Sequence, residues 1–270
     1  MSETKKIALH FAHANGFPAA SYQQLFDTLP NAFEVFALNQ FGHDARFPVN
    51  KNLGNLVDEL IDYLHQTVDQ PVYAVGHSMG ALVSYMAACE APQLFKGVIM
   101  LDPPIVSGWA SWMFKLAKFT PLVDKVSPAG KAAVRCQSWP LDTDLVQYFS
   151  AKGLFRDFNP VCIEDYVKAA IVIKDNHQVL AFDATVEAQI FRNVPDNIQQ
   201  YYGRMTVPSC LITAENSQVC IPANLNHFVK NTQIEHLTVP MVGHMFPLEQ
   251  PVKVAHLIQQ KIHQWESIEA

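Results

Sequence analysis

A serine between two glycines offers the clearest chemistry in this chain. The stretch Gly76-His-Ser-Met-Gly80 follows the apolar run Val72–Val75 and precedes small, apolar residues typical of a buried helix. A tight strand-to-helix turn strains the backbone of its central serine, and side chains two residues away would collide, so glycines are expected there. The following helix points its N-terminus at the turn and favours developing negative charge. The pattern predicts Ser78 as a nucleophile, in preference to a serine that only caps a helix.

A nucleophilic serine needs a base, and the chain has 11 histidines. His244 follows the last expected strand, His236–Val239, and precedes a final helical segment. An imidazole has an ordinary pKa near neutrality, which suits a general base, and this position makes His244 the best candidate. The other candidates lack that position or are expected to shape the loops around the serine: His227, His236, His13 and His77.

The acid that would orient the base is ambiguous. The turn after the next-to-last expected strand carries Glu215, but Asn216 or Ser217 stands where an aspartate would be usual. Asp102 closes the strand that follows the nucleophile helix and also precedes a proline, a pairing common in plain turns. We expect Asp102 to be the acid and keep Glu215 as the alternative.

Backbone N–H groups should stabilise an oxyanion at this serine. One donor is expected from Met79, the residue after the nucleophile. The other is expected from the loop Phe11–Pro18, directly after the first apolar run. We expect Asn15 to supply it, with Phe17 as the alternative if Gly16 is the motif glycine.

The elements that must position these groups alternate between short apolar runs and helical patterns. Such alternation predicts an α/β fold with a mainly parallel sheet covered by helices on both faces. Residues 103–205 interrupt this alternation, because they contain aromatic-rich helical segments and no clear core strand. We therefore expect a mostly helical cap between two parts of the core, residues 1–102 and 206–270. The expected strands are Ile7–Phe11, Val35–Leu38, Val72–Val75, Gly97–Leu101, Cys210–Thr213 and His236–Val239.

Composition excludes several other classes of protein. The net charge of −6 gives no sign of binding to nucleic acid or to an anionic membrane. Five scattered cysteines contain no CxxC pair, which argues against a disulfide framework or a zinc site. No stretch approaches the roughly 18 apolar residues that would span a bilayer, and no signal peptide is seen. We expect a cytoplasmic protein without a metal or cofactor, and the sequence leaves its oligomeric state open.

These motifs together resemble the α/β-hydrolase superfamily over essentially the whole chain, and within it an uncharacterised bacterial, esterase- or lipase-like branch. The branch has an Ala-His-x-x-Gly-Phe opening, an acid followed by proline after the nucleophile helix, and a His-x-x-Pro-Leu-Glu-x-Pro close. Two positions depart from the superfamily pattern: the Gly42-His43-Asp44 turn lacks its second glycine, and alanine replaces the usual glycine at 214. The segments of this chain that match the three motifs of the branch are Ala12–Phe17, Asp102-Pro103 and His244–Pro251.

The resemblance implies acyl transfer to water through a Ser-His-acid triad. An ester, thioester or lactone with an apolar acyl part is expected, because aromatic residues of the cap could line an apolar pocket. Those aromatic residues could equally form the core of the cap itself. Two other readings stay open: a non-catalytic small-molecule-binding protein on the same fold, and a carbon–carbon bond hydrolase. The cap residues predicted to contact substrate are Trp109, Trp112 and Trp139.

Overall fold

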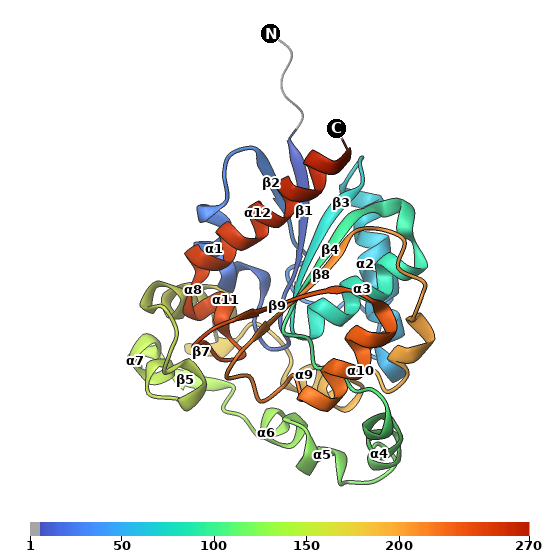
Figure 1. Ribbon diagram of the computed structural model, residues 1–270. Helices are drawn as coiled ribbons and strands as arrows, with labels where there is room; N and C mark the ends of the chain where they lie inside the picture. Colours follow the sequence, from blue (N-terminus) through green and yellow to red (C-terminus); the bar gives the residue numbers. More distant parts are fainter. Residues whose placement is uncertain (1–5, 270) are drawn as a thin grey trace.

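Six parallel strands form the central sheet of the protein (Figure 1). The computed structural model describes residues 6–269, so the ends of the predicted core, residues 1–5 and 270, lie outside the described residues. The strand order is β2-β1-β3-β4-β8-β9, and every neighbouring pair is parallel, which confirms the predicted fold class. Strand β2 is shifted by two residues toward the N-terminus from its expected range, whereas each of the other five strands contains its expected range. The strands are β1 (Ile7–Ala12), β2 (Phe33–Phe36), β3 (Val72–His77), β4 (Phe95–Leu101), β8 (Ser209–Ala214) and β9 (Glu235–Val239).

Alternating apolar side chains give the sheet two buried faces. In β1, Leu9 and Phe11 pack into one hydrophobic cluster, whereas Ala8 and Ala12 pack into the other. Helices α1 (Gln23–Thr28) and α12 (Pro251–Glu269) contribute to the first cluster. Burying each large apolar side chain in this way stabilises the fold by about 1.5–3 kcal/mol. The second cluster includes α2 (Gly54–Thr67), α3 (Met79–Glu90) and α10 (Pro222–Thr232).

The chain between β4 and β8 forms a layer beyond the carboxyl ends of the strands, along the lower side of Figure 1. All its elements fall inside the range predicted as a cap, residues 103–205. It also holds a three-stranded antiparallel sheet, β5-β7-β6, that the sequence did not predict. The elements are α4 (Trp109–Ala117), α5 (Val123–Val126), α6 (Ala129–Ala133), β5 (Ser138–Pro140), α7 (Leu145–Ser150), η4 (Gly153–Phe155), α8 (Pro160–Ala170), β6 (Ile171–Lys174), β7 (His177–Leu180), α9 (Ala184–Arg192) and η5 (Ile198–Tyr201).

Short helices complete the loops around the sheet. Among them, α11 lies between β9 and α12 and follows directly on the loop of His244. This position keeps the predicted base close to the end of a core strand. The short helices are η1 (Ala19–Tyr22), η2 (Lys51–Leu53), η3 (Pro92–Leu94) and α11 (Phe246–Glu249).

A buried carboxyl group ties α2 to the loop after β2. Glu59 is only 4% exposed, and its Oε2 accepts a hydrogen bond of 2.8 Å from the N–H of Gly42. Burial raises the pKa of Glu59 from 4.5 to about 7. The folded state therefore holds a proton that the unfolded chain releases at lower pH, and stability falls as pH rises through this window.

Glu59→Gln is expected to stabilise the protein above pH ~7, because glutamine keeps an acceptor for Gly42 without a buried charge. The gain in the free energy of unfolding should be about 1–2 kcal/mol near pH 8 and should vanish toward pH ~4.5. Urea unfolding across this range measures it. Glu34→Gln, an exposed carboxyl of β2, serves as the control. Parallel pH profiles for wild type and Glu59→Gln would contradict the expectation.

Candidate active site

Ser78 occupies a strained turn between β3 and α3. Its backbone has φ 55° and ψ −118°, a conformation that ordinary residues avoid. A Cβ at Gly76 would lie 2.4 Å from the carbonyl oxygen of Gly80, and one at Gly80 would lie 2.2 Å from that of Ala12. The glycines are therefore needed because backbone passes directly over both positions. The turn is anchored by the N–H of Ser78, which donates to the carbonyl of Leu101 at 2.8 Å.

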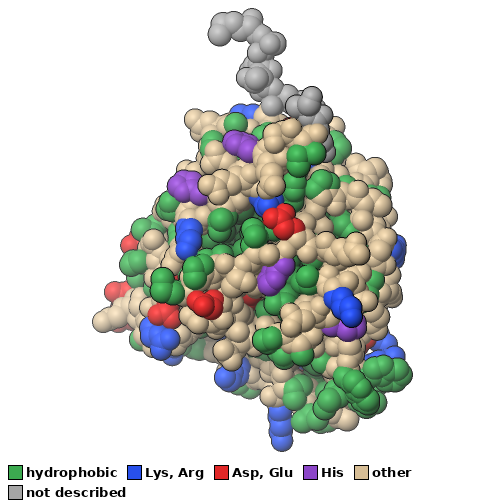
Figure 2. All heavy atoms as spheres, in the orientation of Figure 1, with side chains coloured by type: hydrophobic (Ala, Val, Ile, Leu, Met, Phe, Trp, Pro, Cys, Tyr) green, Lys and Arg blue, Asp and Glu red, His purple; other side chains and the backbone are tan. Residues whose placement is uncertain are grey.

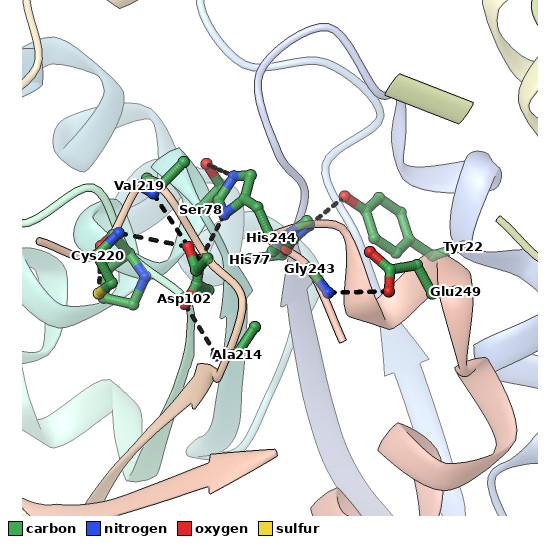
Figure 3. Close-up of polar contacts among 12 residues, drawn as sticks. Tyr22, His77, Ser78, Asp102, Ala214, Val219, Cys220, Gly243, His244 and Glu249 are labelled. Carbon is green, nitrogen blue, oxygen red and sulfur yellow. Dashed lines mark hydrogen bonds and ion pairs between the residues drawn. The ribbon is translucent and has the colours of Figure 1, made fainter. Parts of the chain in front are cut away.

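Three side chains form a continuous line of hydrogen bonds at this turn. The Oγ of Ser78 lies 3.0 Å from Nε2 of His244, and Nδ1 of the same ring lies 2.6 Å from Oδ2 of Asp102 (Figure 3). Ser78, His244 and Asp102 follow β3, β9 and β4 along the chain. Because parallel strands bring their carboxyl ends to one edge of the sheet, the three side chains can meet there. The structure thus brings together the predicted nucleophile, base and preferred acid.

Asp102 is fully buried, and its carboxylate is held by more than the histidine. Its Oδ1 accepts the N–H of Ala214 at 3.1 Å, and its Oδ2 accepts the hydroxyl of Ser217 at 2.5 Å. Its own backbone has φ 44°, a left-handed conformation that is uncommon outside glycine and is tolerated best by Asn and Asp. These contacts satisfy a buried charge and fix the direction in which the carboxylate faces His244.

The alternative acid, Glu215, lies elsewhere. Its side chain is exposed, and its Oε2 accepts the N–H of Met241 at 2.8 Å. The structure shows no hydrogen bond or ion pair between Glu215 and His244. Ser217 is a site residue that sequence reasoning missed. It stands where an aspartate was looked for, and it supports Asp102 through its hydroxyl instead.

The predicted oxyanion donors lie in two segments that touch. Gly80 packs against the backbone of Ala12 and His13, so the loop after β1 lies over the first turn of α3. The N–H of Phe17, the alternative donor, already donates to the carbonyl of Ala14 at 3.1 Å. Over residues 6–269, the N–H groups of Met79 and Asn15 have no hydrogen-bond acceptor. This favours the pair Met79 and Asn15 for the role.

A family model described as "Alpha/beta hydrolase family" matches residues 11–257, which is most of the chain. The chain belongs to the alpha/beta hydrolase family. The resemblance noted from the motifs is thereby confirmed, and the protein is a hydrolase.

Two curated relatives of this hydrolase are lipases by name. The chain is 20% identical to the monoglyceride lipase homolog of Monkeypox virus over 239 residues, which covers 84% of this chain and 76% of the viral protein. It is 30% identical to the monoglyceride lipase of Rattus norvegicus over 115 residues, 39% of this chain and 38% of the rat protein.

Solved structures resemble the hydrolase over nearly its full length. E-2-(acetamidomethylene)succinate hydrolase superposes with a TM-score of 0.78 at 18% identity, covering 96% of this chain and 92% of that one. A thioesterase domain from the curacin biosynthetic pathway gives 0.74 at 16% identity, with 96% and 93% covered. A marine microorganism esterase gives 0.70 at 17% identity, with 96% and 95% covered. At these identities the likeness establishes the fold.

A second line of hydrogen bonds connects the three loops of the hydrolase site. The hydroxyl of Tyr22 accepts the N–H of Ala14 at 3.2 Å and lies 2.7 Å from Nδ1 of His77. Nε2 of His77 lies 3.0 Å from the carbonyl oxygen of His244 (Figure 3). A carbonyl can only accept, so Nε2 of His77 carries the proton and Nδ1 accepts the proton of Tyr22. Buried groups thus link the loop after β1, the nucleophile turn and the loop of His244. This agrees with the structural role expected for His77.

The electrostatic state of His77 matters for the neighbouring base. The two rings of His77 and His244 lie 5.1 Å apart between centroids. Burial, together with the proximity of His244, holds the pKa of His77 well below its ordinary value. His77 therefore stays neutral and places no competing positive charge beside an imidazolium at His244. Burial likewise lowers the pKa of His13 to about 4.

Tyr22→Phe is expected to lower kcat roughly tenfold or more with little change in KM. It removes the acceptor for Ala14 and the donor to His77, leaving both buried groups unpaired at a cost of about 1–3 kcal/mol. Tyr85→Phe is the matched control, because its hydroxyl donates to the carbonyl of Tyr201 and touches none of the three loops. Both variants should lose stability, but only Tyr22→Phe should lose turnover. Equal turnover would contradict this role.

The cap is fastened to the predicted oxyanion loop. The side-chain amide of Asn15 donates to the carbonyl oxygen of Glu187 at 2.9 Å, and the two carboxylate oxygens of Glu187 accept from Nη1 of Arg135 at 3.0 and 2.9 Å. The N–H of Asp183 donates to Nε2 of His43 at 3.0 Å. Between these segments lies a cavity of about 10 Å³, too small for more than one water. Helix α9 therefore holds Asn15 in place from the cap side.

The three tryptophans predicted to contact substrate lie away from the triad. Trp139 is buried against Tyr148 and Phe149 in the core of the cap. Trp109 and Trp112 lie on the outer surface of α4. In the described part of the chain, no hydrogen bond or ring contact joins any of them to Ser78, Asp102 or His244. The structure thus gives no support to the predicted substrate contacts, because the cap packs its aromatic residues against one another or exposes them. The other buried aromatic residues of the described cap are Phe155, Phe158, Tyr166, Phe182 and Tyr201.

Proposed function

We propose that this hydrolase cleaves a carboxylic ester or thioester through an acyl-enzyme on Ser78. One observation carries the proposal: the unbroken hydrogen-bonded line from Ser78 through His244 to the buried carboxylate of Asp102. A serine, a histidine and an acid in this arrangement form the machinery of nucleophilic acyl transfer. A binding protein without catalysis has no need of this line, so the line favours an enzyme.

The proposed reaction has two halves. Nε2 of His244 takes the Ser78 proton as Oγ attacks the substrate carbonyl, and Asp102 orients the ring and stabilises the imidazolium. The N–H groups of Met79 and Asn15 stabilise the tetrahedral oxyanion, each being worth about 2.7–4 kcal/mol. The imidazolium then gives its proton to the leaving alcohol or thiol. In the second half, His244 deprotonates a water that attacks the acyl-enzyme, and its proton returns to Ser78 as the acid leaves.

An apolar acyl part suits the charges of the cap. The three partly buried lysine and arginine side chains of the described cap are all paired: Lys118 with Asp196 at 2.9 Å, Arg135 with Glu187 at 2.9 Å, and Arg192 with Asp124 at 2.7 Å. None of them offers a free charge to a substrate carboxylate or phosphate. The names of the relatives, monoglyceride lipases, an esterase and a thioesterase domain, are consistent with an ester or thioester of this kind.

A series of p-nitrophenyl esters and acyl thioesters of increasing chain length tests the proposal. We expect wild type to cleave them, with kcat/KM rising from acetyl to medium-chain acyl groups and with a burst of leaving group where deacylation limits the rate. The matched control is Ser78→Ala. Release by folded wild type no faster than by Ser78→Ala, across the whole series, would contradict it.

A further inference from the structure

Large apolar side chains are exposed on helices α4 and α5 of the cap. Trp109 is 84% exposed and Phe119 is 75% exposed, although both side chains gain by leaving water. Figure 2 shows hydrophobic side chains gathered at the lower right of the molecule, where Figure 1 places α4. We call this cluster the α4–α5 surface; it consists of Trp109, Trp112, Met113, Leu116, Phe119, Leu122 and Val126.

Helix α4 exposes its large apolar residues, which is the reverse of an ordinary surface helix. Its buried residues are the small ones, Ser111 and Ala117, whereas Trp112 and Met113 point to solvent. A surface helix normally buries its large apolar residues and exposes its polar ones. A contiguous exposed apolar patch of this kind marks a surface that binds a protein or a membrane.

The charges around the patch distinguish between these partners. Residues 103–135 contain five basic side chains and one acidic side chain, in a chain whose net charge is −6. The acidic one, Asp124, is paired with Arg192, and two of the basic ones pair with cap carboxylates. The other three are exposed, and the structure gives none of them an ion pair within residues 6–269. They are Lys115, Lys125 and Lys131.

We propose that the α4–α5 surface docks on a lipid surface that carries anionic headgroups. Tryptophan, phenylalanine and leucine flanked by lysine are the residues that insert at the boundary of headgroups and acyl chains. Lys115 lies 5.7 Å from the ring centre of Trp112, so its charge would reach the headgroups as the ring enters the membrane. A second copy of the chain fits less well, because it would bring two sets of unpaired lysines together. Whole-chain charge hides this surface, since acidic residues elsewhere outweigh it.

The structure describes no helix long and apolar enough to cross a bilayer, so the proposed contact is peripheral. The inference goes beyond the proposed ester cleavage and does not require it. Helix α4 begins seven residues after Asp102, in the layer beyond the carboxyl ends of the strands. Docking would thus turn the side of the molecule that carries the triad toward the lipid.

Sedimentation with vesicles of two compositions tests the proposal. Ser78→Ala is mixed with pure phosphatidylcholine or with an equimolar mixture of phosphatidylcholine and phosphatidylglycerol, at low and high salt. We expect about tenfold stronger binding to the anionic vesicles, because each lysine near such a surface adds roughly fivefold before screening. High salt should reduce the difference.

Intrinsic fluorescence reports the contact directly. Two of the four tryptophans, Trp109 and Trp112, belong to the surface, whereas Trp139 and Trp265 are buried. Anionic vesicles should therefore shift the emission to the blue in the parent protein. The shift and the sedimentation should disappear in Trp109→Ser/Trp112→Ser and stay in the matched control Ile173→Ser/Ile268→Ser, which alters equally exposed apolar residues elsewhere.

The outcomes separate the possible occupants. Binding that needs the two tryptophans and weakens in Lys115→Glu/Lys125→Glu/Lys131→Glu supports the proposal. The proposal is overturned if the folded protein does not bind anionic vesicles at low salt. It is also overturned if the protein binds no vesicles and instead forms a dimer that the Trp109→Ser/Trp112→Ser substitutions dissociate. Because the vesicle experiment uses Ser78→Ala, failure here and failure of ester cleavage are independent results.

Discussion

Replacing Ser78 with alanine is expected to lower kcat for ester cleavage by about a million-fold. The variant keeps the pocket and the backbone donors but removes the oxygen that attacks, so only the weak catalysis of the remaining site is left. His244→Ala should cost about as much, because without the base the Ser78 hydroxyl keeps its proton. The double variant should be no worse than either single one, since the two groups act as a unit. Steady-state rates on the best p-nitrophenyl ester measure all three.

Ser84→Ala is the matched control for this experiment. Ser84 lies on α3, the helix that follows Ser78; it is fully buried, and its hydroxyl has no hydrogen-bond partner among the described residues. Its loss should leave turnover unchanged. Turnover retained by Ser78→Ala, or lost equally in Ser84→Ala, would show that the chemistry lies elsewhere.

Asp102→Asn is expected to lower kcat by about ten-thousand-fold while the fold is kept. Asparagine can turn its NH₂ toward Nδ1 of His244, which then accepts and leaves the proton on Nε2. In that tautomer Nε2 donates to Ser78 and cannot take its proton. The same burst and steady-state measurements apply. Thermal unfolding should accompany them, because Asp102 also accepts bonds from Ala214 and Ser217.

Two companion variants identify the acid. Glu215→Gln should keep nearly full turnover, because its carboxyl group is exposed and bonds only the N–H of Met241. Ser217→Ala should show a smaller loss than Asp102→Asn, since it removes one of several bonds to the carboxylate. A large loss in Glu215→Gln with a small loss in Asp102→Asn would reverse the assignment.

The strands and the nucleophile turn could be predicted because their signals are local. An apolar run bounded by turn residues marks each core strand, and the glycines at 76 and 80 follow from steric demands within one turn. The choice between Asp102 and Glu215 was not local. It depends on which carboxyl group the end of β9 faces, and only the parallel register of β4, β8 and β9 decides that.

The features that were missed arise from contacts between distant segments. Tyr22 carries no motif, yet its hydroxyl joins Ala14 to His77 across 55 residues of chain. The small cap sheet has strands of three or four residues, and β6 is mostly exposed, so it left no alternating pattern to find. Aromatic residues of the cap looked alike in the sequence. Packing alone separates the buried Trp139 from the exposed Trp109.

The most direct test of the central claim is labelling with a fluorophosphonate, followed by mass spectrometry of the modified peptide. This probe reacts with a serine that a neighbouring base has activated. We expect one adduct per chain, on the peptide that contains Ser78, formed much more slowly in Asp102→Asn and absent in His244→Ala. An adduct on another residue, or none on the folded wild-type protein, would contradict an activated serine at the end of β3.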